Sequence, residues 1–232
     1  MALIVLWDID HTLIDNAGVS KEIYGEAFEA VARRRPSGPA VTEGRTDLLI
    51  MREMFERQGL ALPEWDAVQA ALEAAGRERF EELRRRGRAL PGVRDALTAV
   101  TQEPGIISSV LTGNIAANAR LKLAAFALDE LVDLEVGAYG ADHLERAALV
   151  AIARDRIHAA YAVPAGTPVV LAGDTPRDVE AALTNGVQIV AVATGVNSAA
   201  ELRGAGADVV LPDLTDTTAL MMHFKRLAAD RD

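Results

Sequence analysis

Six short aliphatic runs, recurring between stretches of helical periodicity, constrain the fold of this chain more than any other feature. Apolar residues fill most of each run without regular polar alternation, which is typical of strands buried on both faces of a parallel sheet. Strands that alternate with helices of this length indicate βα units, with helices on both faces of the sheet. The runs cover residues 3–7, 106–111, 131–137, 168–173, 187–193 and 207–212. The pattern therefore predicts an α/β fold built on one parallel sheet.

The segment between the first two runs breaks this rhythm. Residues 20–35, 46–60 and 64–88 have helical periodicity, and no convincing strand lies between them. We predict an all-helical domain at 16–88, inserted into an α/β core domain formed by 1–15 and 89–232. Because ligands of open α/β sheets bind at the carboxyl ends of the strands, the insertion is expected above that edge.

Composition narrows the classes of protein to consider. The formal charge of -10 argues against nucleic-acid binding, which usually needs a basic face. No run of about 18 apolar residues occurs, so no transmembrane helix and no membrane partner are expected. The start "MALIVLWDID" lacks a basic region and fits a first strand better than a signal peptide. The absence of cysteine excludes disulfides and thiolate metal sites and fits a cytoplasmic protein.

Polar residues that can carry chemistry stand where predicted strands end. Asp8 and Asp10 follow the first run, and residues two apart in a strand point to the same face. Two carboxylates so close raise each other's pKa unless cations or hydrogen bonds offset the repulsion, so the pair indicates a site. A parallel sheet would bring three more groups to the same edge: Thr112-Gly113-Asn114, the set Asp142, His143, Glu145 and Arg146, and Gly173 to Asp178 in "GDTPRD".

These residue types are chemically consistent with one another. Aspartates without a His or Cys ligand set suit a hard ion such as Mg²⁺. A carboxylate is also a possible nucleophile towards a phosphoryl group. Thr112 offers a hydroxyl, and the amides that open the helix after it offer donors for phosphate oxygens; we also expect Thr112 to cap that helix. Arg146 would offset negative charge.

The chain resembles the haloacid dehalogenase superfamily, in the helical-cap phosphatase branch related to phosphoglycolate phosphatase. The family's DxDxT motif matches Asp8, Asp10 and Thr12. Its second motif, a Thr or Ser after a hydrophobic strand, matches Thr112 in "VLTGN", and its GDxxxD motif matches "GDTPRD". The resemblance covers nearly the whole chain and implies a Rossmann-like core with an inserted helical cap.

The resemblance also implies roles, position by position. Asp8 would be the nucleophile and a metal ligand, and Asp10 the general acid and base, with its carbonyl on the metal. Asp174 would be a metal ligand, and Asp178 a ligand or a partner through water. The phosphoryl group would be held by Thr112, Gly113 and Asn114.

Two positions depart from the family pattern. The third motif is usually a lysine, and Arg146 stands about where it belongs, so we assign it that role in catalysis and substrate binding. Lys122 is the rival for this role, although its position two turns into the helix is also that of an ordinary solvent-facing residue. His11 stands where the family commonly has glycine and is a candidate for substrate binding. In the insertion, "GRTD" at 44–47 is a substrate-contacting loop or a helix N-cap.

The sequence therefore predicts an enzyme: a Mg²⁺-dependent phosphatase that hydrolyses a small phosphomonoester through an aspartyl-phosphate, with phosphoglycolate as one candidate substrate. Its partner would be a small phosphorylated metabolite, and the protein a monomer or homodimer. Two alternatives stay open. One is a phosphosugar mutase of the β-phosphoglucomutase type, and the other is a non-catalytic regulatory protein on the same scaffold.

Overall fold

A six-stranded sheet forms the centre of the computed structural model, which describes residues 2–229. The strand order is β5-β4-β1-β6-β7-β8, and every neighbouring pair is parallel. Each of the six predicted runs coincides with one of these strands, although β5 extends one residue beyond its run, to Ala138. The predicted fold class is therefore confirmed. The strands are β1 (Leu3–Trp7), β4 (Ile106–Leu111), β5 (Asp133–Ala138), β6 (Val169–Gly173), β7 (Gln188–Val192) and β8 (Val209–Leu211).

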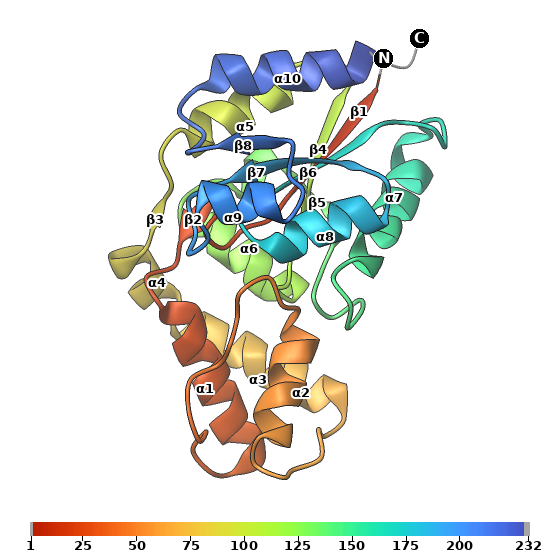
Figure 1. Cartoon of the computed structure of the whole chain (residues 1–232). Coiled ribbons are helices and arrows are strands. Elements are labelled where there is room, and N and C mark those ends of the chain that lie inside the picture. Colours follow the sequence, from red (N-terminus) through yellow and green to blue (C-terminus); the bar gives the residue numbers. More distant parts are fainter. Residues whose placement is uncertain (1, 230–232) are drawn as a thin grey trace.

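Helices cover both faces of the sheet (Figure 1). On β1, Leu3, Val5 and Trp7 join one apolar cluster, whereas Ile4 and Leu6 join the other, as the two-residue period of a strand requires. The first cluster is completed by α5 (Val93–Gln102), α6 (Ala116–Ala124) and α10 (Thr217–Ala229), and the second by α7 (Ala148–Tyr161), α8 (Pro176–Thr184) and α9 (Ala199–Gly204). A short 3₁₀ turn, η1 (Asp129–Leu131), precedes β5. Among residues 2–229, no helix is both long and apolar enough to cross a membrane.

The position of β1 determines where the polar residues meet. This strand lies between β4 and β6, and Trp7 at its end is in register with Val110 and Ala172. From β1 the chain goes first to β4 and β5 on one side and then to β6, β7 and β8 on the other. Crevices form outside the carboxyl ends of strands where the order reverses in this way. The residues that follow β1, β4 and β6 therefore line one crevice.

Four helices fill the segment between the first strand and α5. They are α1 (Val19–Ala32), α2 (Asp47–Glu56), α3 (Trp65–Glu78) and α4 (Phe80–Arg86). They share a third apolar cluster, which Ile115 from the loop after β4 also joins. Their core includes Phe28 and Phe55, whose ring centroids lie 4.7 Å apart. The helix predicted at 64–88 is interrupted at Arg79, whose backbone (φ -92°, ψ 3°) ends α3 and begins α4. Figure 1 shows these helices beyond the carboxyl edge of the sheet.

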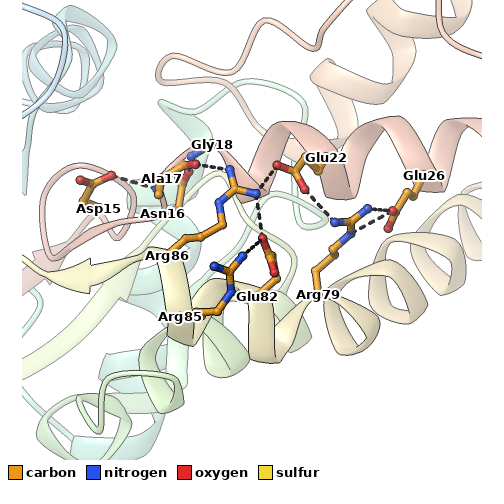
Figure 2. A network of polar contacts seen from close by, with 10 residues as sticks. All are labelled: Asp15, Asn16, Ala17, Gly18, Glu22, Glu26, Arg79, Glu82, Arg85 and Arg86. Carbon is orange, nitrogen blue, oxygen red and sulfur yellow. Dashed lines mark hydrogen bonds and ion pairs between the residues drawn. The ribbon is translucent and has the colours of Figure 1, made fainter.

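Two strands that the sequence pattern did not predict connect these helices to the sheet. β2 (Ile14–Asp15) and β3 (Arg88–Ala89) pair antiparallel, so the outgoing and returning connections run side by side. Arg88 also pairs with Asp15, at 2.9 Å between Nη2 and Oδ2. Beside this ribbon, Arg86 donates to the carbonyl of Ala17 at 2.7 Å and joins the network drawn in Figure 2. Strands of two residues are too short to leave a periodic pattern, which explains why they were missed.

Candidate active site

A cluster of three buried aspartates lies at the carboxyl edge of the sheet. One carboxylate oxygen from each of Asp8, Asp174 and Asp178 lies within 4.8 Å of the others. Arg146 lies among them, with Nη2 3.0 Å from Asp8 Oδ1 and 2.6 Å from Asp178 Oδ1. The cation reduces the repulsion between these two carboxylates but leaves Asp174 without a direct ionic partner among the described residues.

The electrostatics of the cluster follow from burial and incomplete compensation. Burial raises the pKa of Asp8 to about 6; Arg146 opposes this shift, while Asp178 and Asp10 add to it. Burial also raises the pKa of Asp174 well above its usual range, and the carboxylates of Asp178 and Asp8 add to this rise. For Arg146, burial alone would lower the pKa, but Asp178 and Asp8 outweigh it and keep the guanidinium charged. The cluster can therefore accept further positive charge.

Local structure after β6 holds the second pair of aspartates. Asp178 Oδ2 accepts from the amide and hydroxyl of Thr175, at 3.0 and 2.6 Å, and the Thr175 hydroxyl accepts from the Asp178 amide. This capping box, with Pro176 in the first turn, begins α8 as "DTPRD" indicates. Asp174 accepts from the Thr12 hydroxyl at 3.1 Å, which links the loops after β6 and β1.

Asp10 has a different environment, because both of its oxygens accept hydrogen bonds. Oδ2 accepts from Lys122 Nζ at 2.6 Å and from Asn114 Nδ2 at 2.8 Å. Oδ1 accepts from Asn16 Nδ2 at 2.6 Å and from the Ser20 hydroxyl at 3.4 Å. Burial alone would raise the pKa of Asp10, but Lys122, with help from Asn114 and Asn16, lowers it to about 2. Asp10 is thus an ionised carboxylate.

The loop after β4 connects Asp10 to the predicted phosphoryl-binding residues. The Thr112 hydroxyl accepts from Asn114 Nδ2 at 2.8 Å and from the backbone amide of Asn114 at 3.3 Å. The expectation that Thr112 caps the next helix is wrong, because α6 begins at Ala116 and its N-cap residue is Ile115. Three residues of loop separate the threonine from the helix, so its hydroxyl is held by Asn114.

The N-terminus of α2 is docked on this same loop. The Asp47 amide donates to the Gly113 carbonyl at 2.7 Å, and Asp47 Oδ2 accepts from the Ile115 amide at 2.8 Å. Asp47 Oδ1 accepts from the Tyr24 hydroxyl at 2.6 Å. A Cβ on Gly113 would lie 2.0 Å from the Arg45 carbonyl, so only glycine allows this approach.

The helix N-cap interpretation of "GRTD" is confirmed, whereas the substrate-contacting interpretation stays a prediction. Thr46 is the N-cap of α2, and its hydroxyl also donates to the Leu144 carbonyl at 2.8 Å. Gly44 and Arg45 line the cavity above the aspartates. The segment therefore ends a loop over the site and begins a helix.

The enclosed space is small. A cavity of about 50 Å³ lies between the sheet edge and the helices, enough for one or two water molecules. Ligand pockets for drug-sized molecules usually measure about 300–1,000 Å³. A larger ligand therefore requires the helices to move away from the sheet. The cavity is lined by Asp8, Asp10, His11, Asn16, Ser20, Tyr24, Thr42, Glu43, Gly44, Arg45, Thr112, Gly113, Asn114, Arg146, Asp174, Thr175 and Val196.

Most of the residues singled out from the sequence come together here. Asp178 pairs with Arg146, which lines the cavity, but Asp178 itself is not part of the lining. His11 does line the cavity, and its φ of 62° is a left-handed conformation that suits the glycine usual at this position in the family. Asp142 instead pairs with Arg156, at 2.7 and 2.8 Å. The suggestion that Lys122 faces solvent is wrong, because its side chain is only 3% exposed and contacts Asp10.

Four further residues contribute to these contacts without having been predicted from the sequence: Asn16, Ser20, Tyr24 and Asp47. Each lies in or beside the helical insertion, and each contacts the site only through the packing of α1 and α2 on the sheet edge. No local motif distinguishes them from ordinary residues of a helix start.

The donor set fits a divalent cation of the oxygen-binding kind. All three clustered side chains are carboxylates, and none of the described histidines joins them. A hard ion such as Mg²⁺ prefers such ligands, whereas zinc usually takes nitrogen or sulfur. Because Asp8 and Asp174 both have raised pKa values, a bound cation would stabilise their ionised forms.

The family model of haloacid dehalogenase-like hydrolases matches residues 5–183, which include the three motifs and the helical insertion. The chain belongs to this family. No curated protein matches the sequence. The identification therefore rests on the family match, and the geometry above gives it a physical basis.

Solved structures of the family share the fold at low sequence identity. A predicted phosphatase from Clostridium acetobutylicum is 16% identical, with a TM-score of 0.66 and coverage of 96% of this chain and 99% of its own. A predicted phosphoglycolate phosphatase from Haemophilus somnus is 18% identical, with a TM-score of 0.63 and coverage of 95% and 98%. A protein from Bacteroides vulgatus named as a β-phosphoglucomutase is 16% identical, with a TM-score of 0.65 and coverage of 99% and 91%.

Proposed function

We propose that this hydrolase is a Mg²⁺-dependent phosphatase that acts on a small phosphomonoester through an aspartyl-phosphate. The observation that carries the proposal is the position of Asp8, which lies in one buried cluster with Asp174, Asp178 and Arg146. A nucleophilic carboxylate needs nearby positive charge to approach an anionic phosphate. Phosphoglycolate is one candidate substrate, and the cavity of about 50 Å³ supports a small one.

In the proposed first step, Asp8 attacks phosphorus and the ester oxygen departs with a proton from Asp10. Mg²⁺, held by Asp8, Asp174, Asp178 and the carbonyl of Asp10, would supply positive charge beside the phosphoryl oxygens. Arg146 would add a second positive charge, and its buried Nε lacks a hydrogen-bond partner among the described residues, so an oxygen of the substrate would satisfy it. Thr112, Gly113 and Asn114 would hold the phosphoryl group.

In the second step, water attacks the phosphorus of the aspartyl-phosphate while Asp10 takes its proton. The lowered pKa of Asp10 keeps its side chain ionised, which is the form that can accept a proton. The first step needs Asp10 protonated, and the negative charge of an entering phosphate ester raises the pKa of a neighbouring carboxyl. Asp10 can thus serve both steps as the charge beside it changes.

The helices at 16–88 would act as a cap domain over a core formed by 1–15 and 89–232, of which residue 1 and residues 230–232 lie outside the described residues. Opening would admit a small phosphorylated metabolite, and closure would exclude bulk water from the reaction. The contacts of Asp47 and Thr46 with the sheet edge are those that opening must break.

Release of inorganic phosphate from a panel of phosphomonoesters, first with Mg²⁺ and then with EDTA, tests the proposal. We expect turnover that EDTA abolishes, with small aliphatic esters among the best substrates. The control is Asp8→Asn, which keeps the shape of the side chain and removes the nucleophile.

A phosphosugar mutase would share the metal site and the cap but would pass the phosphoryl group to a sugar. Conversion of a sugar 1-phosphate to its 6-phosphate with little phosphate release would replace the phosphatase assignment by this one. A folded protein that binds Mg²⁺ but neither releases nor transfers phosphate would favour a regulatory role.

A further inference from the structure

Two buried cations serve the site, and they contact different carboxylates. Arg146 pairs with Asp8 and Asp178, whereas Lys122 pairs with Asp10. The side chains of both cations are almost completely buried, at 5% and 3% exposed. Burying a lysine costs free energy unless its charge is paired and hydrogen-bonded, so a buried lysine at this position calls for a specific explanation.

The contacts of Lys122 connect the two predicted working parts of the site. Its Nζ lies 2.6 Å from Asp10 Oδ2 and 2.6 Å from Asn114 Oδ1. The amide nitrogen of Asn114 in turn donates to Asp10 Oδ2 and to the Thr112 hydroxyl, each at 2.8 Å. Because Lys122 can only donate, it also determines which end of the Asn114 amide faces Asp10 and Thr112. One ammonium group thereby orients both side chains.

Resting on the proposed phosphatase function, we propose that Lys122 is a positioning residue that acts through Asp10, while Arg146 acts at Asp8. Lys122 and Asn114 together hold Oδ2 of Asp10, and Asn16 holds Oδ1, so the carboxylate has one orientation at the cavity. Without Lys122, one of the two strongest contacts of Oδ2 is lost and the Asn114 amide is free to turn over. The two proton transfers assigned to Asp10 then start from a misplaced group.

A double-mutant cycle between Lys122 and Asp10 tests this assignment, because residues that act through one another show non-additive effects. Lys122→Met keeps the aliphatic stem and removes the charge. We expect it to lower kcat/KM for an alkyl phosphate by about 10- to 100-fold, the scale of a misplaced catalytic group. Asp10→Asn should lower it by about 10²- to 10⁴-fold, the scale of general acid–base catalysis. In the Asp10→Asn background, Lys122→Met should have no further effect.

The leaving group gives an independent readout that loss of folding would not produce. Since kcat/KM reports only the steps up to departure of the leaving group, p-nitrophenyl phosphate, whose leaving group needs little protonation, should lose less kcat/KM than an alkyl phosphate in Lys122→Met. Arg146→Met should lower kcat/KM for both esters by similar factors, and it should lower it further when added to Lys122→Met.

Three outcomes decide the matter. An equal loss from Lys122→Met with and without Asp10→Asn would overturn the proposal, as would equal losses on the two esters. If Lys122→Met does not fold, Lys122→Gln, which keeps a neutral donor at a shorter reach, is judged by the same two comparisons. Wild-type protein that releases no phosphate from either ester would instead refute the proposed function itself, which distinguishes the two failures.

Discussion

Two groups of arginine–carboxylate pairs in this molecule have very different surroundings. In the candidate active site, Arg146 is 5% exposed and pairs with Asp8, whose pKa burial raises. In the network of Figure 2, Arg79 and Arg86 contact Glu22, Glu26 and Glu82 with side chains about one-third exposed. Buried ion pairs often cost more to desolvate than they return, whereas exposed pairs contribute little in either direction. A contribution to stability therefore does not explain why Arg146 is buried, and a role in function does.

The two regions also differ in how well their positive and negative charges are balanced. In the network of Figure 2, five arginine–glutamate contacts fall between 2.6 and 3.2 Å, and water screens what remains of the charge. In the site, three clustered carboxylates face one guanidinium, so the local charge is negative. A bound divalent cation would restore the balance there, and no such deficit exists in the exposed network.

Substitution of the nucleophile should separate activity from stability most strongly. Asp8→Asn is expected to lower turnover by about 10⁴-fold or more, because the covalent step loses its attacking group. It should not lower the free energy of unfolding without metal, because the pKa of Asp8 is raised and a neutral side chain suits the site. Phosphate release and urea denaturation measure the two effects. Wild-type turnover by this variant would remove Asp8 from its assigned role.

Removal of the buried cation should have the largest effect on stability. Arg146→Met leaves Asp8, Asp174 and Asp178 uncompensated, which is expected to cost about 3–5 kcal/mol in EDTA. Added Mg²⁺ should recover part of this loss, since a cation that binds the folded state stabilises it. Urea denaturation with and without Mg²⁺ measures both quantities. An equal loss in the two conditions would argue against a cation at this cluster.

Asp47 is a buried carboxylate that accepts hydrogen bonds only from neutral donors, and this should make the stability of the protein depend on pH. Burial raises the pKa of Asp47 from 3.8 to about 6, although the Tyr24 hydroxyl and the Ile115 amide oppose the shift. Below pH 3.8 the Asp47 side chain is protonated in both the folded and the unfolded chain. As pH rises from 3.8 to about 6, the unfolded chain loses this proton first, so the free energy of unfolding of the wild type falls. Asp47→Asn removes this loss, so its advantage over wild type should grow by about 1–3 kcal/mol across that window.

Urea denaturation of both proteins at pH 4 to 7 measures this difference. Asparagine keeps the shape, and its amide can donate to the Tyr24 oxygen while its carbonyl accepts from the Ile115 amide, so the geometry is preserved. Parallel curves over the whole range would mean that Asp47 ionises as readily in the folded chain as in the unfolded one.

The smallest effect is expected in the network of Figure 2. Arg79→Met removes contacts with Glu22 and Glu26 at a surface where ion pairs contribute about 1 kcal/mol or less. Its effect on stability should shrink further in 0.5 M salt, because salt screens exposed charges. A loss as large as that of Arg146→Met would mean that burial does not account for the difference between the two regions.

The sheet and the main carboxylates could be predicted from the sequence because each depends on a local signal. Continuous aliphatic runs marked the six strands, and Asp8, Thr112 and Asp174 each follow one directly. The contacts of Lys122, Asn16 and Asp47 could not be predicted in this way. They arise where helices from separate parts of the chain pack on the sheet edge, and helical periodicity does not indicate which neighbouring carboxylate a side chain will contact.

For Arg146, the sequence predicted the position in the site but not the contacts. Its position after the third run suggested a cation at the site, and its contacts with Asp8 and Asp178 depend on how the chain enters α7, which packs beside β4 and β5. The break at Arg79 likewise has no local signal, since "GRERFEELRRR" has uninterrupted helical periodicity.

The pairing of the linker strands β2 and β3 has a consequence for how a protein of this architecture can evolve. Because Asp15 lies opposite Arg88, the chain departs for the helices and returns at neighbouring points. Everything between them can be shortened, lengthened or replaced by another unit whose ends lie a strand's width apart, and the chemistry at Asp8 and Asp174 stays in place. Under the function proposed above, such an exchange would keep the carboxylates at the sheet edge and change which substrate reaches them, by recombination alone.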